Sequence, residues 1–248
     1  MGSSRFPGKP VAPLLGRPMI EHVVRRTMLS ETIDAVFVAT CDEEIRSVVE
    51  GFGGAVIMTS AGHERASDRV AEAAETIDAD IIVMVQGDEP MLTPEMIDSA
   101  VASIACDSSI ACVNLAARVS TRAEYLDPNT IKVVMDRNGD ALYFSRWPIP
   151  RIEFDEASPP AVYKQVCVIP FRREFLLEFA RLPPTPLEQL ESIDMLRALE
   201  HRRRVRMVET TISTHAVDTP EDLVYVEQLM SNDPLVAEYD IVQSPAKV

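Results

Sequence analysis

Residues 81–90 of the sequence are Ile-Ile-Val-Met-Val-Gln-Gly-Asp-Glu-Pro. The first five are apolar without the alternation of a half-exposed strand, a pattern typical of a strand buried on both faces of a parallel sheet. Ligands of open α/β sheets bind at the carboxyl ends of the strands, which is where Asp88 follows. A carboxylate in this position can hold Mg²⁺, and Gly87 lets the chain turn close to a ligand. The same residues also fit an ordinary acidic turn.

Outward from this stretch, short apolar runs alternate with longer amphipathic segments. The alternation predicts an α/β domain with a mainly parallel sheet, because parallel strands need crossover connections that are usually helices. The expected strands are 35–40, 55–59, 81–86 and 110–115, and the expected helices are 18–29, 42–51, 67–76 and 94–104.

The pattern changes after residue 119. The apolar segments 131–136, 141–145 and 163–171 follow one another without long helices between them. Asn138-Gly139 is a strong signal for a hairpin turn. We therefore expect an antiparallel insertion over about residues 119–171.

The remaining chain returns to helices, which we expect at 174–180, 187–201 and 219–230, with a strand at 204–210. Thr219 is a good N-cap, and Pro220 suits the first helical position. The residues after Ser231 show little periodicity and are expected to fray. The predicted organisation is one domain over residues 1–230 followed by a C-terminal tail, 231–248.

Composition excludes several classes of protein. The 248 residues are 46% hydrophobic and 25% charged, which excludes a disordered chain, a collagen and a disulfide scaffold. A net charge of −15 repels nucleic-acid phosphates, and the one basic run, 201–206, fits a helix end. No apolar run is long enough to suggest a membrane span, and no signal-peptide core opens the chain. Four cysteines without C-x-x-C spacing favour a reducing cytoplasm.

The N-terminal stretch Gly2-Ser3-Ser4-Arg5-Phe6-Pro7-Gly8-Lys9-Pro10 combines small residues with two cations. Small residues let backbone N–H groups approach a phosphate, and Arg5 and Lys9 would supply positive charge. The alternative is a floppy basic N-terminus. The stretch is not a Walker loop, because Pro10 follows Lys9 where that motif has Ser or Thr.

Two further segments carry polar groups that could serve a site. Asp218 precedes the helix expected at 219–230, either without a role or as a second metal carboxylate that only the fold can bring to Asp88. Lys132 and residues 143–148 lie on the expected hairpin and face either a substrate or solvent. No histidine shows paired metal-ligand spacing, and no Ser/His/Asp or Cys/His arrangement can be recognised.

An ordered set of short motifs resembles the 3-deoxy-manno-octulosonate (Kdo) cytidylyltransferases, also called CMP-Kdo synthetases. The likeness spans about residues 3–230, and the order of the motifs is far more specific than any one of them. The motifs are SSRFPGKP (3–10), LLGRPMI (14–20), VAT (38–40), VQGDEP (85–90), DPN (127–129), IKVV (131–134), ALYFSR (141–146), PLE with LE (186–191) and VDTPED (217–222).

The resemblance implies a three-layer α/β/α, Rossmann-like nucleotidyltransferase fold and a homodimer formed through the insertion. Family members use Mg²⁺, join CTP to the 2-hydroxyl of an acidic keto-sugar and release pyrophosphate. With Kdo as the acceptor, the product would serve lipopolysaccharide or capsule assembly in a Gram-negative cell. No nucleic-acid or membrane partner is expected.

The resemblance also assigns roles to residues. It makes Asp88 and Asp218 the Mg²⁺ ligands, which act in catalysis with Arg5 and Lys9. The residues expected to bind the nucleotide are Ser3, Ser4, Arg5, Lys9, Arg69 and Gln86. Those expected to bind the sugar acid are Gln86, Lys132, Ser145, Arg146, Lys164, Gln165 and Glu188.

Three departures from the family pattern stand out. The family opens with an apolar strand before the motif in which this chain starts, so we expect the recorded start to be too late and the first family strand to be missing. An in-frame stop codon immediately upstream of Met1 would contradict this. The family's S-G-T-[DE]-R segment is here Arg65-Ala66-Ser67-Asp68-Arg69, and its K-H-x-G-x-Y-x-Y-like stretch is replaced by 164–171, with Gln165 in place of the histidine.

Three hypotheses follow. The favoured one is a CTP-dependent transferase acting on Kdo or a related acidic sugar. The second is a nucleotidyltransferase with a different acidic acceptor, which the altered 164–171 stretch favours because an apolar replacement leaves a sugar hydroxyl unpaired. The third is a non-catalytic nucleotide-binding protein, which would have no turnover for Asp88→Asn to remove.

Overall fold

The structure is a computed structural model that describes residues 6–158 and 160–241. The chain forms two compact units. The first contains residues up to Glu64, Val85–Asp98 and the chain from Thr214 onward, and the second contains Arg65–Met84 and Ser99–Ser213.

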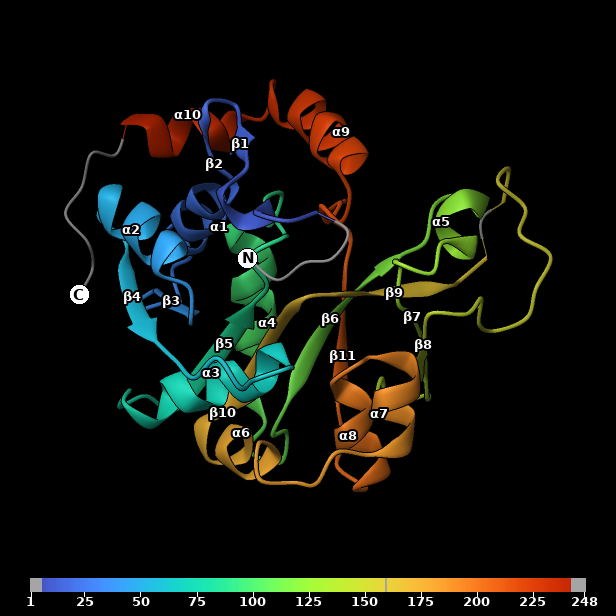
Figure 1. The fold of residues 1–248 in the computed structure, drawn as a ribbon. Helices are drawn as coiled ribbons and strands as arrows, with labels where there is room; N and C mark the ends of the chain where they lie inside the picture. The colour runs from blue at the N-terminus through green and yellow to red at the C-terminus, as the bar shows by residue number, and fades with distance from the viewer. Residues whose placement is uncertain (1–5, 159, 242–248) are drawn as a thin grey trace. The chain divides into compact units, whose positions relative to one another are not determined.

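The first unit brings both ends of the described chain together, as the blue and red segments of Figure 1 show. Its strands β3 and β4 pair in parallel, with α2 as the crossover, and Asp42 caps α2 by accepting from the backbone N–H of Glu44 and Ile45. The elements are η1 (Lys9–Val11), β1 (Pro13–Leu14), β2 (Arg17–Pro18), α1 (Met19–Met28), β3 (Phe37–Thr40), α2 (Glu43–Gly51), β4 (Ala55–Met58), α9 (Pro220–Met230) and α10 (Pro234–Ile241).

A small apolar core joins the N-terminal hairpin β1–β2 to the C-terminal helices of this unit. Its fully buried members are Leu14, Met19, Val217, Val226 and Met230. The hairpin follows Lys9, and Val217 precedes Asp218. The segments that carry these two charged residues are therefore anchored in one core. By contrast, Phe37 on β3 and Met58 on β4 are each 38% exposed.

The second unit is built on a five-stranded sheet in the order β11-β6-β9-β7-β8. Strands β6 and β11 are parallel, and the β6–β9, β9–β7 and β7–β8 pairs are antiparallel. Strand β5, which ends where the chain enters the first unit, pairs with β10. The strands are β5 (Ile81–Val85), β6 (Val113–Arg118), β7 (Lys132–Met135), β8 (Ala141–Ser145), β9 (Tyr163–Val166), β10 (Val168–Arg172) and β11 (Arg206–Thr210).

Helices pack around this sheet. Helix α3 packs against α6, and α8 packs against both α7 and β8. Helix α4 begins in the first unit and ends in the second. The bounds are α3 (Ala66–Glu75), α4 (Pro94–Cys106), α5 (Arg122–Leu126), α6 (Arg173–Phe179), α7 (Pro186–Glu191) and α8 (Met195–Glu200). The α/β class expected from the alternating pattern is confirmed.

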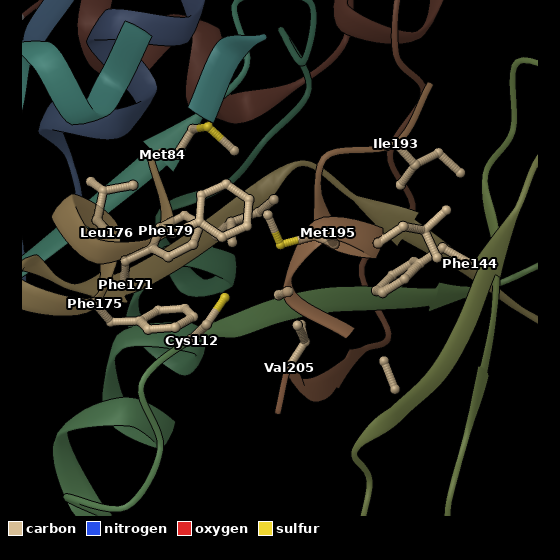
Figure 2. Packing of buried hydrophobic residues seen from close by; sticks show 14 of the residues in the cluster. Met84, Cys112, Phe144, Phe171, Phe175, Leu176, Phe179, Ile193, Met195 and Val205 are labelled. Atoms are coloured by element: carbon tan, nitrogen blue, oxygen red, sulfur yellow. The ribbon is translucent and has the colours of Figure 1, made fainter. Parts of the chain in front are cut away.

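The larger apolar core of the molecule lies in the second unit. Figure 2 shows Phe171, Phe175 and Phe179 beside Met84 and Met195. The three phenylalanine rings have centroids 6.2–6.4 Å apart, within the range of favourable aromatic pairs. They come from β10 and successive turns of α6, so this cluster fixes the helix on its strand.

The predicted hairpin is confirmed. Strands β7 and β8 pair antiparallel, and Gly139 of the Asn-Gly turn has a φ of 81°, which a residue with a side chain rarely adopts. Asp136 N–H donates to the carbonyl of Asp140, closing the turn.

The single helix predicted over 187–201 is wrong, because the chain forms α7 and α8 with a break between them. Ser192 at the end of α7 has a φ of 57° and a ψ of 50°. The Arg146 side chain donates to the carbonyls of Glu191 and Ser192, which a continuous helix would need for its own N–H groups. A contact from a distant segment therefore overrides the local helical pattern.

Two more expectations need correction. The strand predicted over 163–171 is two strands, because β9 pairs with β6 and β7 whereas β10 pairs with β5. The tail expected to fray after Ser231 contains α10, in which Tyr239 is only 3% exposed. The burial of this helix against the rest of its unit is not visible in the periodicity of its sequence.

Within residues 6–158 and 160–241, no helix combines the length and the hydropathy that a bilayer crossing requires. The four cysteines all lie in this described part and carry free thiols. Cys112 is fully buried, and burial raises the pKa of its thiol well above the usual range.

Candidate active site

Lys9 is held in a short 3₁₀ turn of the first unit. Gly8 precedes it with a φ of 74°, and Lys9 N–H donates to the carbonyl of Phe6 at 3.2 Å. Lys9 is only 9% exposed. A buried lysine that is paired points its charge in a defined direction, which a floppy N-terminus would not do.

Asp88 lies in the turn that follows β5. Glu89 N–H donates to the carbonyl of Gln86 at 3.2 Å and closes this turn. A Cβ at Gly87 would lie 3.1 Å from Cδ1 of Ile20 on α1, tighter than most contacts of this kind. The glycine therefore lets the acidic turn approach α1 closely.

Asp218 lies just before α9, and the helix cap fixes its backbone. The Asp222 carboxylate accepts from the N–H groups of Asp218 (3.1 Å) and Thr219 (2.8 Å), and from the Thr219 hydroxyl. His215 Nε2 lies 3.0 Å from the same carboxylate. Burial raises the pKa of Asp222, but the hydrogen bonds from His215 and Thr219 outweigh it and hold that pKa below the usual value.

These three segments bring Lys9, Asp88 and Asp218 together. Lys9 Nζ lies 2.7 Å from Oδ2 of Asp88 and 3.5 Å from Oδ1 of Asp218. Both carboxylates are about one quarter exposed. The fold thus unites two carboxylates that are 130 positions apart in the chain, and it favours the reading in which Asp218 shares a site with Asp88.

One backbone and one side-chain hydrogen bond hold the two acidic segments side by side. Val217 N–H donates to the carbonyl of Asp88 at 2.9 Å. The Thr214 hydroxyl donates to the buried Glu89 carboxylate at 3.1 Å. Sequence reasoning did not single out Thr214, Glu89 or Asp222, because their role depends on contacts between distant segments.

The donor set of this site fits Mg²⁺. Among the described residues, no three His, Cys, Asp or Glu side chains gather into a metal site. Mg²⁺ needs no such cage, since it is commonly held by one or two carboxylates together with substrate phosphates. The Lys9 ammonium, a cation, already lies between the two carboxylates and cancels only one of their two charges.

The structure says less about the other residues that are expected to bind the nucleotide. Ser3, Ser4 and Arg5 lie outside the described residues. Gln86 is half-buried, two positions before Asp88, and Arg69 belongs to α3 of the second unit. Their roles toward a nucleotide stay predictions.

Of the residues expected to bind the sugar, Lys132 has the most constrained side chain. Its Nζ donates to the carbonyls of Asp127, Thr130 and Arg146 at 2.6–2.8 Å, and the residue is fully buried. Burial lowers the pKa of Lys132 to about 8. In this structure the lysine holds the main chain at one end of the hairpin.

Ser145 and Arg146 are organised by Glu191, a residue that sequence reasoning quoted in a motif but did not assign to the site. The Glu191 carboxylate accepts from the Ser145 hydroxyl at 2.7 Å and from the Arg146 backbone N–H at 2.9 Å. The Arg146 guanidinium donates to the main-chain carbonyls of Glu191 and Ser192, at the end of α7. The contacts fix the end of β8 to α7.

The last three expected sugar ligands also have protein partners. Lys164 pairs with Glu124 at 2.5 Å, and Gln165 Nε2 donates to Oδ1 of the buried Asn114 at 2.5 Å. Glu188 is 1% exposed and receives two hydrogen bonds from Arg197. A sugar-binding role for these residues stays a prediction.

Comparison with solved structures shows which proteins share this fold. A CMP:2-keto-3-deoxy-manno-octonic acid synthetase complexed with CTP has a TM-score of 0.84 at 37% identity, over 94% of this chain and 95% of that one. A putative glucose-1-phosphate thymidylyltransferase from Bacillus anthracis has a TM-score of 0.66 at 17% identity, over 90% of this chain and 87% of that one. The fold expected from the sequence, that of the nucleotidyltransferases, is confirmed.

The comparison by sequence is more specific. A family model described as cytidylyltransferase matches residues 1–208. The 3-deoxy-manno-octulosonate cytidylyltransferases of Geobacter metallireducens and Syntrophotalea carbinolica are both 48% identical, over 92% and 91% of this chain and 94% and 93% of theirs. The chain belongs to the 3-deoxy-manno-octulosonate cytidylyltransferase family and is a nucleotidyltransferase enzyme.

Proposed function

We propose that the enzyme transfers CMP from CTP to the 2-hydroxyl of Kdo and releases pyrophosphate, with Mg²⁺ as its cofactor. The observation that carries this proposal is the meeting of Lys9, Asp88 and Asp218 at one point, in a chain 48% identical to Kdo cytidylyltransferases. Transfer to a hydroxyl needs charge neutralisation at the phosphates more than it needs a protein nucleophile.

The chemistry requires a sugar oxygen to attack the α-phosphorus of CTP. The bond from that phosphorus to its bridging oxygen breaks, pyrophosphate leaves with the electron pair, and the hydroxyl proton passes to solvent. Lys9 neutralises phosphate charge through its ammonium, which its contacts with Asp88 and Asp218 hold at this point. Asp88 and Asp218 would hold Mg²⁺, which when bound stabilises phosphoryl charge and lowers the pKa of the attacking hydroxyl.

Preorganisation supports this assignment. The hydrogen bond from Val217 to the Asp88 carbonyl and the cap formed by Asp222 hold the backbone segments that carry the two carboxylates. Such fixed charges stabilise a transition state without reorganisation at the moment of reaction. The alternative, an ordinary acidic turn that is only solvated, gives no reason for these contacts.

A second candidate is a different acidic acceptor, such as an amino-sugar acid or a non-sugar acid. The observation that favours it is Gln165, which stands where the family has a histidine and whose amide is held by Asn114. A site that presents an amide and apolar groups pairs a different set of hydroxyls from one that presents histidine and tyrosine. Both candidates use the same nucleotide half of the site.

We further propose a homodimer in the cytoplasm, whose product feeds lipopolysaccharide or capsule assembly. Three apolar side chains on or beside the insertion support the dimer: Leu126, Leu142 and Trp147 are 50%, 62% and 77% exposed. Covering these side chains with a second chain would remove apolar surface from water, which favours association.

The test is pyrophosphate release in the presence of Mg²⁺. CTP, UTP, ATP and GTP are each combined with Kdo, 8-amino-Kdo and sialic acid. Release that needs both CTP and Kdo supports the proposal. Release with CTP and another of these acids supports the second candidate, and release that does not depend on CTP contradicts both.

A further inference from the structure

We propose that α10 is a positioning element for the active site. Two contacts with α1 fix the backbone segments that carry Lys9 and Asp88: Tyr239 of α10 with His22, and Asp233, which directly precedes α10, with Arg26. The blue and red elements of Figure 1 show α10 beside the N-terminal hairpin and α1, within the first unit. The part of this proposal that concerns nucleotide binding rests on the proposed function.

His22 links α10 to the hairpin after Lys9. The residue is fully buried, with Nε2 2.7 Å from the carbonyl oxygen of Leu14 and Nδ1 2.6 Å from the hydroxyl of Tyr239. A carbonyl only accepts, so Nε2 carries the proton, and Nδ1 accepts from the Tyr239 hydroxyl. Burial lowers the pKa of His22, which keeps the ring in this neutral form.

Arg26 lies one helical turn after His22, on the same face of α1. Its guanidinium is fully buried, donates to Asp233 at 2.6 Å and to the carbonyl of Leu92 at 3.2 Å, and faces the Tyr239 ring. Asp233 also accepts from the N–H of Leu235 in the first turn of α10. The helix is thus tied to α1 at its beginning and near its end.

The two backbone groups that α1 holds flank the site. Leu14 lies in the hairpin that directly follows the Lys9 turn, where Ala12 N–H donates to the Lys9 carbonyl. Leu92 lies four positions after Asp88, and its N–H donates to the carbonyl of Glu89. In the described residues, α10 makes none of the contacts of Lys9, Asp88 and Asp218 given above. Its effect therefore passes through His22 and Arg26.

The experiment compares Tyr239→Phe and Asp233→Asn with Glu238→Gln, which changes an exposed side chain on the same helix. Two quantities are measured in the full chain at 25 °C: amide hydrogen exchange over residues 9–19, and the Kd for CTP with Mg²⁺. We expect faster exchange in this segment and about tenfold weaker CTP binding in the first two variants, and no change in Glu238→Gln.

A purely structural role would speed exchange evenly across the unit and leave CTP affinity unchanged, and this result would overturn the proposal. Unchanged exchange at residues 9–19 in both variants would also overturn it. If the unaltered protein does not bind CTP, the proposed function fails, while the exchange experiment still decides whether α10 orders the hairpin. If Tyr239→Phe does not fold, Asp233→Asn, which keeps an acceptor for Leu235 N–H, provides both readouts.

Discussion

At the scale of single residues, Asp88 is the side chain on which the proposed chemistry depends most. Replacing it with asparagine removes one of two negative charges and leaves Lys9 with only Asp218, at 3.5 Å. We expect Asp88→Asn to lower the rate of pyrophosphate release about a hundredfold or more while the protein stays folded. The matched control is Asp78→Asn, at an exposed position of the second unit. Full turnover in folded Asp88→Asn would contradict the role.

Lys132 gives a pH-dependent prediction. Its pKa is about 8 in the folded protein and 10.5 in the unfolded chain, so between these values the unfolded chain binds more protons. The free energy of unfolding should therefore rise with pH from about 8 to 10.5, by roughly 3 kcal/mol from this group. Urea denaturation measures this as the difference between the unaltered protein and Lys132→Met. A difference that falls or stays constant over this range would contradict the prediction.

Sequence reasoning can select candidate residues whose chemistry stands alone, but it cannot select those whose role depends on a distant partner. Lys9 and Asp88 could be selected from charge, glycine and position after a buried strand. The partners Asp222 and Glu191 could not be selected in this way. The sequence does not distinguish an acidic helix residue whose carboxylate is solvated from one whose carboxylate accepts from a backbone N–H elsewhere.

At the scale of elements, Arg197 joins its own helix, α8, to three other helices of the second unit. The residue is 2% exposed, and its guanidinium donates to Glu188 of α7 and Asp68 of α3 and lies over the ring of Phe179 in α6. These partners keep the pKa of Arg197 above its usual range, despite burial.

We expect Arg197→Met to lower the free energy of unfolding by about 3–5 kcal/mol, because it leaves the buried Glu188 carboxylate with only Arg65, at 3.7 Å, as a cationic partner. Adding Glu188→Gln should recover part of this loss, since the second change removes the uncompensated charge. Urea denaturation of the single and double variants measures both effects. Equal stability of Arg197→Met and the unaltered protein would show that the network contributes nothing.

The elements themselves were largely predictable from periodicity and caps. Helices α1, α2, α3, α4 and α9 and strand β8 lie at or within two residues of their expected bounds. The failures have tertiary causes: Arg146 takes the carbonyls at the end of α7, strand pairing changes at Cys167, and α10 is stabilised by contacts with α1. No local propensity carries this information.

At the scale of the whole molecule, the proposed homodimer can be tested with the protein's single tryptophan. Trp147 is 77% exposed in one chain. We expect light scattering to give twice the 27.5 kDa of one chain, and Trp147→Glu to return it to a single chain, because a charge in an apolar interface stays unpaired. A single-chain mass for the unaltered protein would contradict the dimer.

Fold class was accessible from sequence because alternating strands and helices leave few ways to bury both faces of a sheet. The division into two compact units was not, because each unit is assembled from separated stretches of chain. The site depends on that assembly, since Lys9, Asp88 and Asp218 come from the three stretches of the first unit.

The β3–β4 pair affects how the purified protein behaves in a concentrated solution. The two parallel strands expose apolar side chains, since Phe37 and Met58 are each 38% exposed. Exposed strand edges of this kind favour association between copies of the chain. The net charge of −15 opposes this association, because like-charged molecules repel one another. Colloidal stability is then greatest in dilute, near-neutral buffer. Strong salt, which screens that repulsion, or acidification toward the isoelectric point near 4.7 should bring on clouding.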